Sequence, residues 1–381
     1  MHHPIYLDYN GTTPHDPEVI EAMRPFLETH FGNPSSGHWY GHQPRQAVEN
    51  ARQQVADLLN CRAEEILFTS GGTESNNHAI IGTARALQTR GRHLITCAVE
   101  HPAVLEVCRF LETRNFQVTR LSVDNAGRVD PQAVSRAIRS DTILITIMHA
   151  NNEVGTLQPI EEIAAIAKAH GVPMHTDAAQ SIAKIPTDVQ TLGVDLLSLA
   201  GHKLYAPKGV GALYVRRGTP LAKFCYGAGQ EKGRRAGTEN VLEIVGLGRA
   251  CELAREGLAD NTIHLQTLRD RLHQNIIGHL DNVRLNGHGD QRLPNTLSLA
   301  FKEVAANNLL QAIAAEVAAS AGAACHAETV EVSHVLRAMD IPLAWAQGTV
   351  RFSVGRMTTA DEIDRAADIV VQAVRALRGQ K

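Results

Sequence analysis

Apolar residues in the first two thirds of the chain gather in short runs that alternate with longer stretches of helical spacing. Nearly continuous apolar runs are typical of strands covered on both faces, and six of them occur here: residues 65–69, 93–99, 142–148, 172–176, 195–199 and 211–215. Between them lie helical patterns such as residues 160–170, which Gly171 follows as a C-terminal cap. This alternation predicts an α/β fold, with a mainly parallel sheet between two layers of helices.

The pattern changes after about residue 240. A long helical stretch leads into shorter strand-like runs with helices between them, namely residues 240–278 for the long helix, 283–285, 296–301 and 349–353 for the strands, and 359 onward for the last helix. This order favours a second, smaller α+β domain. We expect a large domain of residues 15–250, and a small domain formed by residues 1–14 and 251–381.

Composition narrows the class of protein. Hydrophobic residues make up 44% and charged residues 20%, which is ordinary for a globular chain. A formal net charge of -3 provides no basic field that would favour nucleic acid as a partner. No apolar run has the length of a membrane span, and the first residues lack the basic and apolar regions of a signal peptide. We therefore expect a cytoplasmic protein that binds neither nucleic acid nor a membrane.

The cysteines and histidines do not form a metal-binding pattern. The six cysteines have irregular spacings and contain no CxxC pair, which argues against a structural zinc site and against a disulfide framework. The nineteen histidines are scattered rather than clustered at ligand spacing. The sequence predicts no metal site.

Lys203 and Asp177 carry the most specific chemical signal. Each stands at or just after the end of a strand-like run, and the two runs are consecutive. A lysine can form a Schiff base with the aldehyde of pyridoxal phosphate, and an aspartate can keep its pyridine nitrogen protonated, so that the ring accepts electrons. Because most lysines are solvated surface charges, the prediction of a pyridoxal phosphate site depends on this pairing.

Three further strand ends carry polar residues. Gly72 and Thr73 open a helix, where free backbone N–H groups favour an anion such as a phosphate; a plain capping turn is the alternative. His101 can stack on a flat ring or move protons, or it can cap a helix. Asn152 can hydrogen-bond a phenolic oxygen. Since strand ends of an open α/β sheet form the ligand-binding edge, these residues and Asp177 predict a common site.

Two residues of the C-terminal part are candidates for direct contact with a substrate. Cys325 lies in a segment of small residues between two predicted helices. A catalytic thiol must be exposed and partly ionised, and an inert buried cysteine is the alternative. Arg351 flanks a strand-like run. Arginine can bind a carboxylate through two parallel hydrogen bonds, and a surface ion pair is the alternative.

The chain resembles the class V aminotransferase-like enzymes of pyridoxal phosphate fold type I, and within them the cysteine desulfurase and selenocysteine lyase group. The matching stretches run nearly from end to end, at residues 6–14, 32–36, 69–76, 99–101, 150–153, 175–180, 201–203, 237–240 and 351–356. The resemblance implies a large domain with a mainly parallel seven-stranded sheet, a smaller α+β domain and a homodimer.

The resemblance also implies a role for each matching residue at the cofactor. Lys203 carries pyridoxal phosphate and moves the α-proton of the substrate, Asp177 pairs with the pyridine nitrogen, and His101 stacks on the ring as an acid or base. The remaining implied contacts are hydrogen bonds, from Asn152 and Gln180 near the phenolic oxygen, and from Gly72, Thr73, His202 and the neighbouring subunit's Thr238 at the phosphate. Ala200 stands where many desulfurases have a serine, so one hydroxyl contact to the phosphate is missing.

For the substrate, the resemblance implies that Arg351, helped by Asn33, binds the carboxylate and that Cys325 attacks the sulfur. The implied reaction converts L-cysteine to L-alanine, with a persulfide on Cys325 whose sulfur passes to an acceptor protein, for example toward iron–sulfur clusters. A selenocysteine lyase, which releases selenide from L-selenocysteine, is the related alternative, and the sequence around Lys203, Cys325 and residues 344–351 leans toward it. An aminotransferase would not need the thiol, and a non-catalytic scaffold would not need Lys203 and Asp177.

Overall fold

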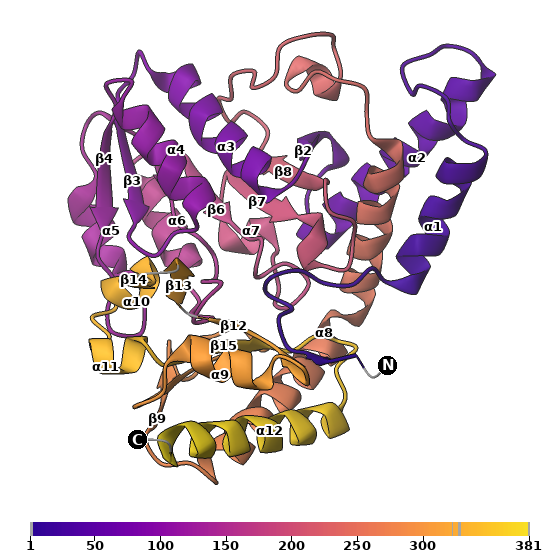
Figure 1. The fold of residues 1–381 in the computed structure, drawn as a ribbon. Helices are drawn as coiled ribbons and strands as arrows, with labels where there is room; N and C mark the ends of the chain where they lie inside the picture. Colours follow the sequence, from indigo (N-terminus) through magenta and orange to yellow (C-terminus); the bar gives the residue numbers. More distant parts are fainter. Residues whose placement is uncertain (1–2, 322, 327–328, 380–381) are drawn as a thin grey trace.

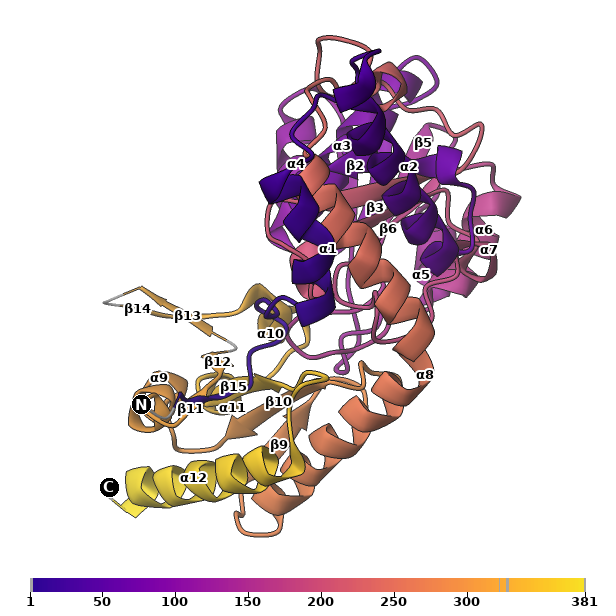
Figure 2. The ribbon, with the colours of Figure 1, turned by 90° about the vertical axis from the view of Figure 1, so that its right-hand side faces the viewer.

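The computed structural model describes residues 3–321, 323–326 and 329–379, and within residues 322–331 it describes no side chains. Figure 1 shows a larger part with one sheet and its helices and a smaller part below it. The long helix α8 (Val241–Ile277) runs from the first part into the second, as Figure 2 shows from the side.

The larger sheet has seven strands in the order β2-β8-β7-β6-β5-β3-β4. The strands are Ile66–Thr69 (β2), His93–Cys97 (β3), Gln117–Leu121 (β4), Thr142–Thr146 (β5), Met174–Asp177 (β6), Leu196–Ala200 (β7) and Gly211–Val215 (β8). β8 pairs antiparallel with β2 and β7, whereas all other neighbours are parallel. The predicted α/β class with a mainly parallel seven-stranded sheet is confirmed.

The six apolar runs of the sequence all become strands of this sheet, but β4 was not predicted. β4 lies at the sheet edge next to β3 only, and its residues Gln117 and Arg120 are exposed. β4 is thus not covered on both faces and has no continuous apolar run, whereas β2 at the other edge is fully buried and has one. The signal that identified the other six strands is therefore absent from β4.

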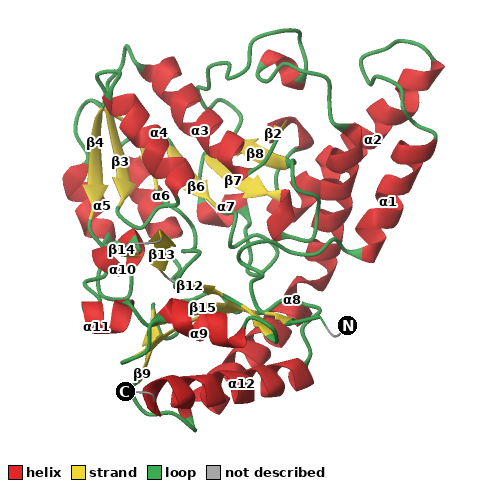
Figure 3. Cartoon of the chain, viewed as in Figure 1, coloured by secondary structure: helices red, strands yellow, loops and turns green. Residues whose placement is uncertain are grey.

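Helices cover both faces of the larger sheet, as Figure 3 shows. Alternate strand residues point to opposite faces, so Leu94 and Leu196 pack with α3 and α4, while the next residues, Ile95 and Leu197, pack in the core on the other face. The helices of this part are Pro17–Glu28 (α1), Trp39–Leu59 (α2), Gly72–Leu87 (α3), Pro102–Glu112 (α4), Pro131–Ala137 (α5), Ile160–Ala169 (α6) and Val189–Leu192 (α7).

The smaller part is built on a four-stranded antiparallel sheet in the order β12-β15-β10-β9. Its strands are Ser320–Ala321 (β12), Thr349–Ser353 (β15), Thr296–Phe301 (β10) and Val283–Asn286 (β9), and beside it β1 (Ile5–Tyr6) pairs with β11 (Val317–Ala318). Helices α9 (Ala306–Ile313) and α12 (Ala360–Gly379) pack on this sheet, and α10 (His334–Ala338) and α11 (Leu343–Ala346) lie nearer the larger part. No helix in the described ranges is long and apolar enough to cross a membrane.

The division into domains at about residue 250 remains our proposal, and the packing of α8 supports it. Leu247 and Cys251, in the first half of α8, are buried in the core of the larger sheet. Leu268 and Leu272, in the second half, are buried in the core of the smaller part. The helix thus leaves one apolar core and enters another.

We expect Leu272→Ala to lower the free energy of unfolding by about 3 kcal/mol, because it leaves a cavity in a well-packed core. Leu272 is 0% exposed. The urea midpoint, followed by circular dichroism, measures this change. Ile263→Ala on the same helix is the matched control, since Ile263 is 65% exposed, and it should change stability by less than about 0.5 kcal/mol. Equal midpoints for the two variants would contradict the assigned packing.

Candidate active site

A cavity of about 320 Å³ lies at the carboxyl ends of the parallel strands, between the larger sheet and the smaller part. Residues that are distant in the sequence meet there, since its lining comes from the N-terminal segment, several strand ends and β15. Most of the predicted site residues line it, namely Gly72, Thr73, His101, Asn152, Asp177, Gln180, His202, Lys203 and Arg351. The expectation that strand ends deliver one site holds for this set.

Lys203 stands in a short helical turn that follows β7. Its Nζ donates to the backbone carbonyls of Asn10 at 2.5 Å and Gly11 at 2.7 Å. Burial and then the nearby Arg351 charge lower the pKa of Lys203 to about 8, against the opposite effect of Asp8 and Asp177. A lysine with such a pKa has a substantial fraction of neutral, nucleophilic amine near neutral pH, as a Schiff-base lysine requires.

Asp177 ends β6, and its carboxylate is held from both sides. Asn76 on α3 donates to Oδ2 at 2.7 Å, and the Ala179 N–H donates to Oδ1 at 2.9 Å. The residue is 6% exposed, and none of the ion pairs among the described residues includes it. A buried carboxylate fixed by neutral donors can accept one more hydrogen bond from a cationic ligand atom.

The start of α3 offers an anion site on the same cavity. Gly71 precedes the helix with φ of 143°, a conformation that favours glycine, and Gly72 and Thr73 form the first turn, where backbone N–H groups are free. His202 also lines this cavity, and its Nδ1 lies 3.2 Å from the Thr12 hydroxyl. Burial, followed by the charge of Lys203, lowers the pKa of His202 to about 4, so it contributes a neutral hydrogen bond.

His101 both caps a helix and lies at the cavity, which are the two alternatives that the sequence left open for it. Its Nδ1 accepts a hydrogen bond from the Ala103 N–H at 3.1 Å and so caps α4, while the ring also lines the cavity. With Nδ1 accepting, the neutral ring carries its proton on Nε2. Burial lowers the pKa of His101, Asp177 opposes this shift, and Lys203 and His334 strengthen it.

Arg351 reaches the cavity from β15 of the smaller sheet. Its Nη2 pairs with Asp8 Oδ1 at 2.7 Å, and its Nη1 donates to the backbone carbonyl of Asn152 at 3.0 Å. Its Nε is buried and has no hydrogen-bond partner among the described residues. The guanidinium is thus oriented at the cavity with donor capacity to spare, which suits a carboxylate.

Three predicted residues lie elsewhere or cannot be placed. Asn33 and Thr238 are exposed and do not line the cavity of this chain, so their roles stay predictions. The backbone of Cys325 belongs to β13 (Ala323–His326), which forms a hairpin with β14 (Thr329–Val332), whereas its thiol lies outside the described side chains. In Figure 2 this hairpin extends away from the smaller sheet.

Four residues of the site were missed by sequence reasoning. Asn76 holds Asp177, Asp8 holds Arg351, Asn10 accepts from Lys203, and Lys184 donates to Gln180. Asn76 follows Thr73 by one helical turn, a spacing that places both on neighbouring parts of one helix face, so this residue could have been found. Asp8, Asn10 and Lys184 meet the site only through the tertiary fold.

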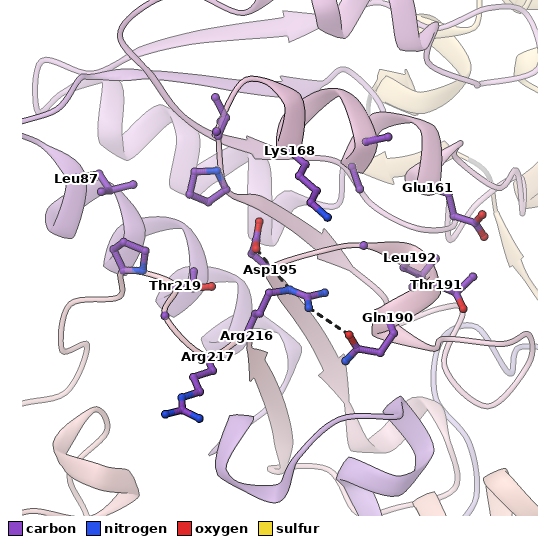
Figure 4. A pocket seen from close by; sticks show the side chains of 18 of the residues that line it. Leu87, Glu161, Lys168, Gln190, Thr191, Leu192, Asp195, Arg216, Arg217 and Thr219 are labelled. Atoms are coloured by element: carbon purple, nitrogen blue, oxygen red, sulfur yellow. Dashed lines mark hydrogen bonds and ion pairs between the residues drawn. The ribbon is translucent and has the colours of Figure 1, made fainter.

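A second cavity, of about 720 Å³, lies at the other end of the strands. Figure 4 shows Arg216 there beside Asp195 and Gln190, at 3.6 Å and 3.2 Å. The lining includes Lys168 and Asp195, but Lys168 is exposed and the Asp195 carboxylate is already held by Arg216 and by the Met174 N–H, unlike the largely buried pair of Lys203 and Asp177. Volume alone therefore does not identify the reactive site. No group of side chains in the described ranges is placed to hold a metal ion.

The arrangement fits pyridoxal phosphate. A low-pKa lysine can bind its aldehyde, a buried carboxylate can hold its pyridine N–H, and a helix start can bind its phosphate. Asn76 Oδ1 is buried at the same place without a partner among the described residues. Gly72 has no side chain at the cavity, so a ligand can approach its backbone closely. An added Cβ would stand 3.2 Å from the Ala200 Cβ.

Comparisons with known proteins agree with this site. The family model "Aminotransferase class-V" matches residues 5–366. The chain is 47% identical to cysteine desulfurase IscS of Dictyoglomus turgidum, over 99% of this chain and 96% of that one, and 46% identical to that of Methanosarcina thermophila, over 98% and 93%. Among solved structures, a NifS-like protein superimposes with a TM-score of 0.92 at 35% identity, covering 98% of this chain and 100% of that one. "SspA in complex with cysteine" gives 0.81 at 39%, covering 93% and 99%.

The chain belongs to the class-V aminotransferase family, and it is an enzyme that depends on pyridoxal phosphate. Within that family it belongs with the cysteine desulfurases. The family resemblance and the cofactor that the sequence predicted are confirmed.

The depressed pKa of Lys203 leads to a test on the apoprotein. Labelling of Lys203 by acetic anhydride, followed by mass spectrometry, should rise with a midpoint near pH 8, because only the neutral amine reacts and burial lowers its pKa to about 8. A solvated lysine has a pKa of about 10.4. A labelling midpoint of Lys203 in that higher range would contradict the proposed electrostatics of the cavity.

Proposed function

We propose that this protein is a cysteine desulfurase that converts L-cysteine to L-alanine and transfers the sulfur to Cys325. The observation that carries the proposal is the meeting of Lys203, Asp177 and Arg351 around one cavity. Lys203 and Asp177 suit a pyridoxal phosphate site, and Arg351 can pair with the carboxylate of an amino acid. The cysteine desulfurase relatives and the cysteine complex of a structural neighbour support the choice of substrate.

Pyridoxal phosphate, when bound, supplies an electron sink that makes the α-proton of an attached amino acid acidic. The residues of the chain do the remaining work. Lys203, with a pKa of about 8, can take up that proton and return one near neutral pH. Asp177 keeps a cationic ring nitrogen in place, and the His101 ring on the cavity wall can orient the substrate or move a proton.

Arg351 defines the carboxylate end of the substrate. In the free site it pairs with Asp8, and both side chains are largely buried, with 12% and 25% exposed. A substrate carboxylate can replace Asp8 at Nη2 while Nη1 keeps its bond to the Asn152 carbonyl. This arrangement favours an α-amino acid, because Arg351 and Lys203 then hold its carboxylate and amino ends.

The sulfur step conserves atoms and electrons. The Cys325 thiolate attacks the sulfur of the substrate, the bond between that sulfur and the β-carbon breaks, and the carbon keeps the electron pair and is protonated to give alanine. Cys325 is left as a persulfide, which can pass its outer sulfur to a second thiol. We propose an acceptor protein as the carrier of that thiol, with iron–sulfur clusters as one destination.

We expect the protein to form alanine from L-cysteine with kcat/KM within about tenfold of the value for L-selenocysteine, and Cys325→Ala to reduce the cysteine reaction by about 10³-fold or more, as loss of a catalytic nucleophile does. Steady-state alanine assays measure both. Cys225→Ala is the matched control, because Cys225 is a free thiol that is partly exposed, and it should retain activity.

Two outcomes would overturn the proposal. A preference for L-selenocysteine of several orders of magnitude would indicate a selenocysteine lyase. Full cysteine turnover by Cys325→Ala would indicate chemistry that does not use this thiol, as in an aminotransferase. The visible absorbance of bound cofactor in Cys325→Ala controls for loss of the site itself.

We also propose a homodimer in which Thr238 completes the phosphate site of the neighbouring subunit. Thr238 is exposed and does not line the cavity of its own chain, and an exposed aromatic cluster of Phe31, Trp39 and Tyr40 offers apolar surface for association. A cytoplasmic location is part of the proposal. The five cysteines with described side chains are free thiols, which suits a reducing compartment.

Mixing two inactive variants tests the shared site. Lys203→Ala and Thr238→Ala should each lose most activity, but refolding them together should restore activity, because a mixed dimer has one site with Lys203 from one chain and Thr238 from the other. Refolding each variant alone is the control. If Thr238 acts on its own chain, the mixture stays as inactive as its components.

A further inference from the structure

Lys184 is a buried lysine that the proposed reaction does not use. It lies in the turn after β6 and is 6% exposed. Its Nζ donates to the backbone carbonyl of Gln180 at 2.8 Å and to Gln180 Oε1 at 3.3 Å, and none of the ion pairs among the described residues includes it. A buried ammonium without a carboxylate is unfavourable, so its presence next to a cavity residue suggests a function.

The chain is folded locally to bring Lys184 back onto Gln180. Ala183 has φ of 62°, in the left-handed region that few residues other than glycine adopt. From α8, the Thr262 hydroxyl donates to the backbone carbonyl of Lys184 at 2.8 Å. The backbone conformation and this bond together fix the position from which the Lys184 side chain reaches Gln180.

The two partners of the Gln180 side chain determine how its amide is oriented. Its Nε2 donates to the backbone carbonyl of Asn10 at 3.0 Å, while its Oε1 accepts from Lys184. A carbonyl can only accept and an ammonium can only donate. Although the two ends of a glutamine amide are often hard to tell apart, only one orientation satisfies both partners here.

The oriented amide is connected to the cofactor lysine. The Asn10 carbonyl that accepts from Gln180 Nε2 also accepts from Lys203 Nζ at 2.5 Å. Gln180, Asn10 and Lys203 all line the cavity, whereas Lys184 lies behind them and does not. The N–H₂ end of Gln180 is thus presented beside Lys203, on the cavity side.

We propose that Lys184 is a positioning residue, whose ammonium holds the Gln180 amide with its N–H₂ donor toward the cofactor cavity and its oxygen away from it. The inference rests on the proposed function in one respect, since the cofactor carries an oxygen beside the aldehyde that Lys203 binds. Without Lys184 only the Asn10 carbonyl holds the Gln180 amide, so the amide turns more easily, and in the turned state its carbonyl oxygen would repel an anionic ligand oxygen.

The charge of Lys184 is sensitive to its surroundings. Burial, together with the positive charges of Lys203 and Arg351, lowers its pKa to about 7. The two hydrogen-bond partners of the Lys184 ammonium, both on Gln180, are neutral, and Thr262 on α8 contacts the backbone carbonyl of Lys184. Below about pH 7 Lys184 is an ammonium and holds the Gln180 amide. As the pH rises through that value, Lys184 loses its proton and holds the amide less firmly.

The test uses the pH titration of the visible absorbance of the holoenzyme without substrate. In Lys184→Met the midpoint should rise by about 0.5–1 pH unit, the equivalent of one lost hydrogen bond to an anionic oxygen. Gln180→Ala should show a similar rise, and the double variant should rise no further, because both changes remove the same donor. Lys184→Arg, which also only donates, should return the midpoint toward that of the wild type.

Lys168→Met is the matched control, since Lys168 is an exposed lysine outside this cavity. An unchanged midpoint in Lys184→Met, or shifts that add in the double variant, would overturn the proposal. If Lys184→Met does not fold, Lys184→Leu takes its place, because it also removes the ammonium donor. The same rise in the midpoint is expected, and an unchanged midpoint would overturn the proposal. The titration needs no turnover, so failure of cysteine desulfuration would leave its result readable.

Discussion

The hydrogen bonds of residues 8–13 are the constraint on which the whole site depends. This segment lies between the two sheets, and its backbone carbonyls at Asn10 and Gly11 hold Lys203. On the other side, the Asn10 backbone N–H donates to the Ser353 hydroxyl at 2.9 Å, and its side chain bonds Asn295 and Thr296 of the smaller part. One short segment therefore sets the distance between Lys203 and the sheet that carries Arg351.

Close packing gives this segment a single position. Tyr9 lies against Gly355, where an added Cβ would stand 2.0 Å from the Tyr9 ring. Thr13 bonds the turn that carries Lys203, through the His202 carbonyl at 3.0 Å and the Tyr205 N–H at 2.8 Å. Since interfaces packed in this way do not deform continuously, a shift of either sheet must be felt at Lys203. The active site is thus a property of the assembled halves rather than of one strand edge.

Much of this could be predicted from the sequence, because strands buried on both faces leave apolar runs and because Lys203 and Asp177 require specific chemistry. β4 escaped because it is partly exposed and so has no such run. Asn10 and Lys184 escaped for another reason, since a backbone carbonyl and a second-layer lysine carry no local pattern, and their partners are more than 100 residues away or lie within an irregular turn. The role of Thr238 was implied by resemblance and stays a prediction, because one chain does not supply the surroundings that this role needs.

The balance of charge explains why the free site is ordered as it is. Lys203, Lys184 and Arg351 place three cationic groups close enough to lower the pKa of the two lysines, while Asp8 and Asp177 are the acids that offset them. A cofactor phosphate and a substrate carboxylate both add negative charge to this region, so binding relieves a repulsion that folding alone leaves in place. Asp8 meanwhile keeps Arg351 paired at 2.7 Å. A carboxylate on the substrate can pair with the charge of Arg351 that the protein already provides. The site therefore favours amino acids over amines that carry no carboxylate.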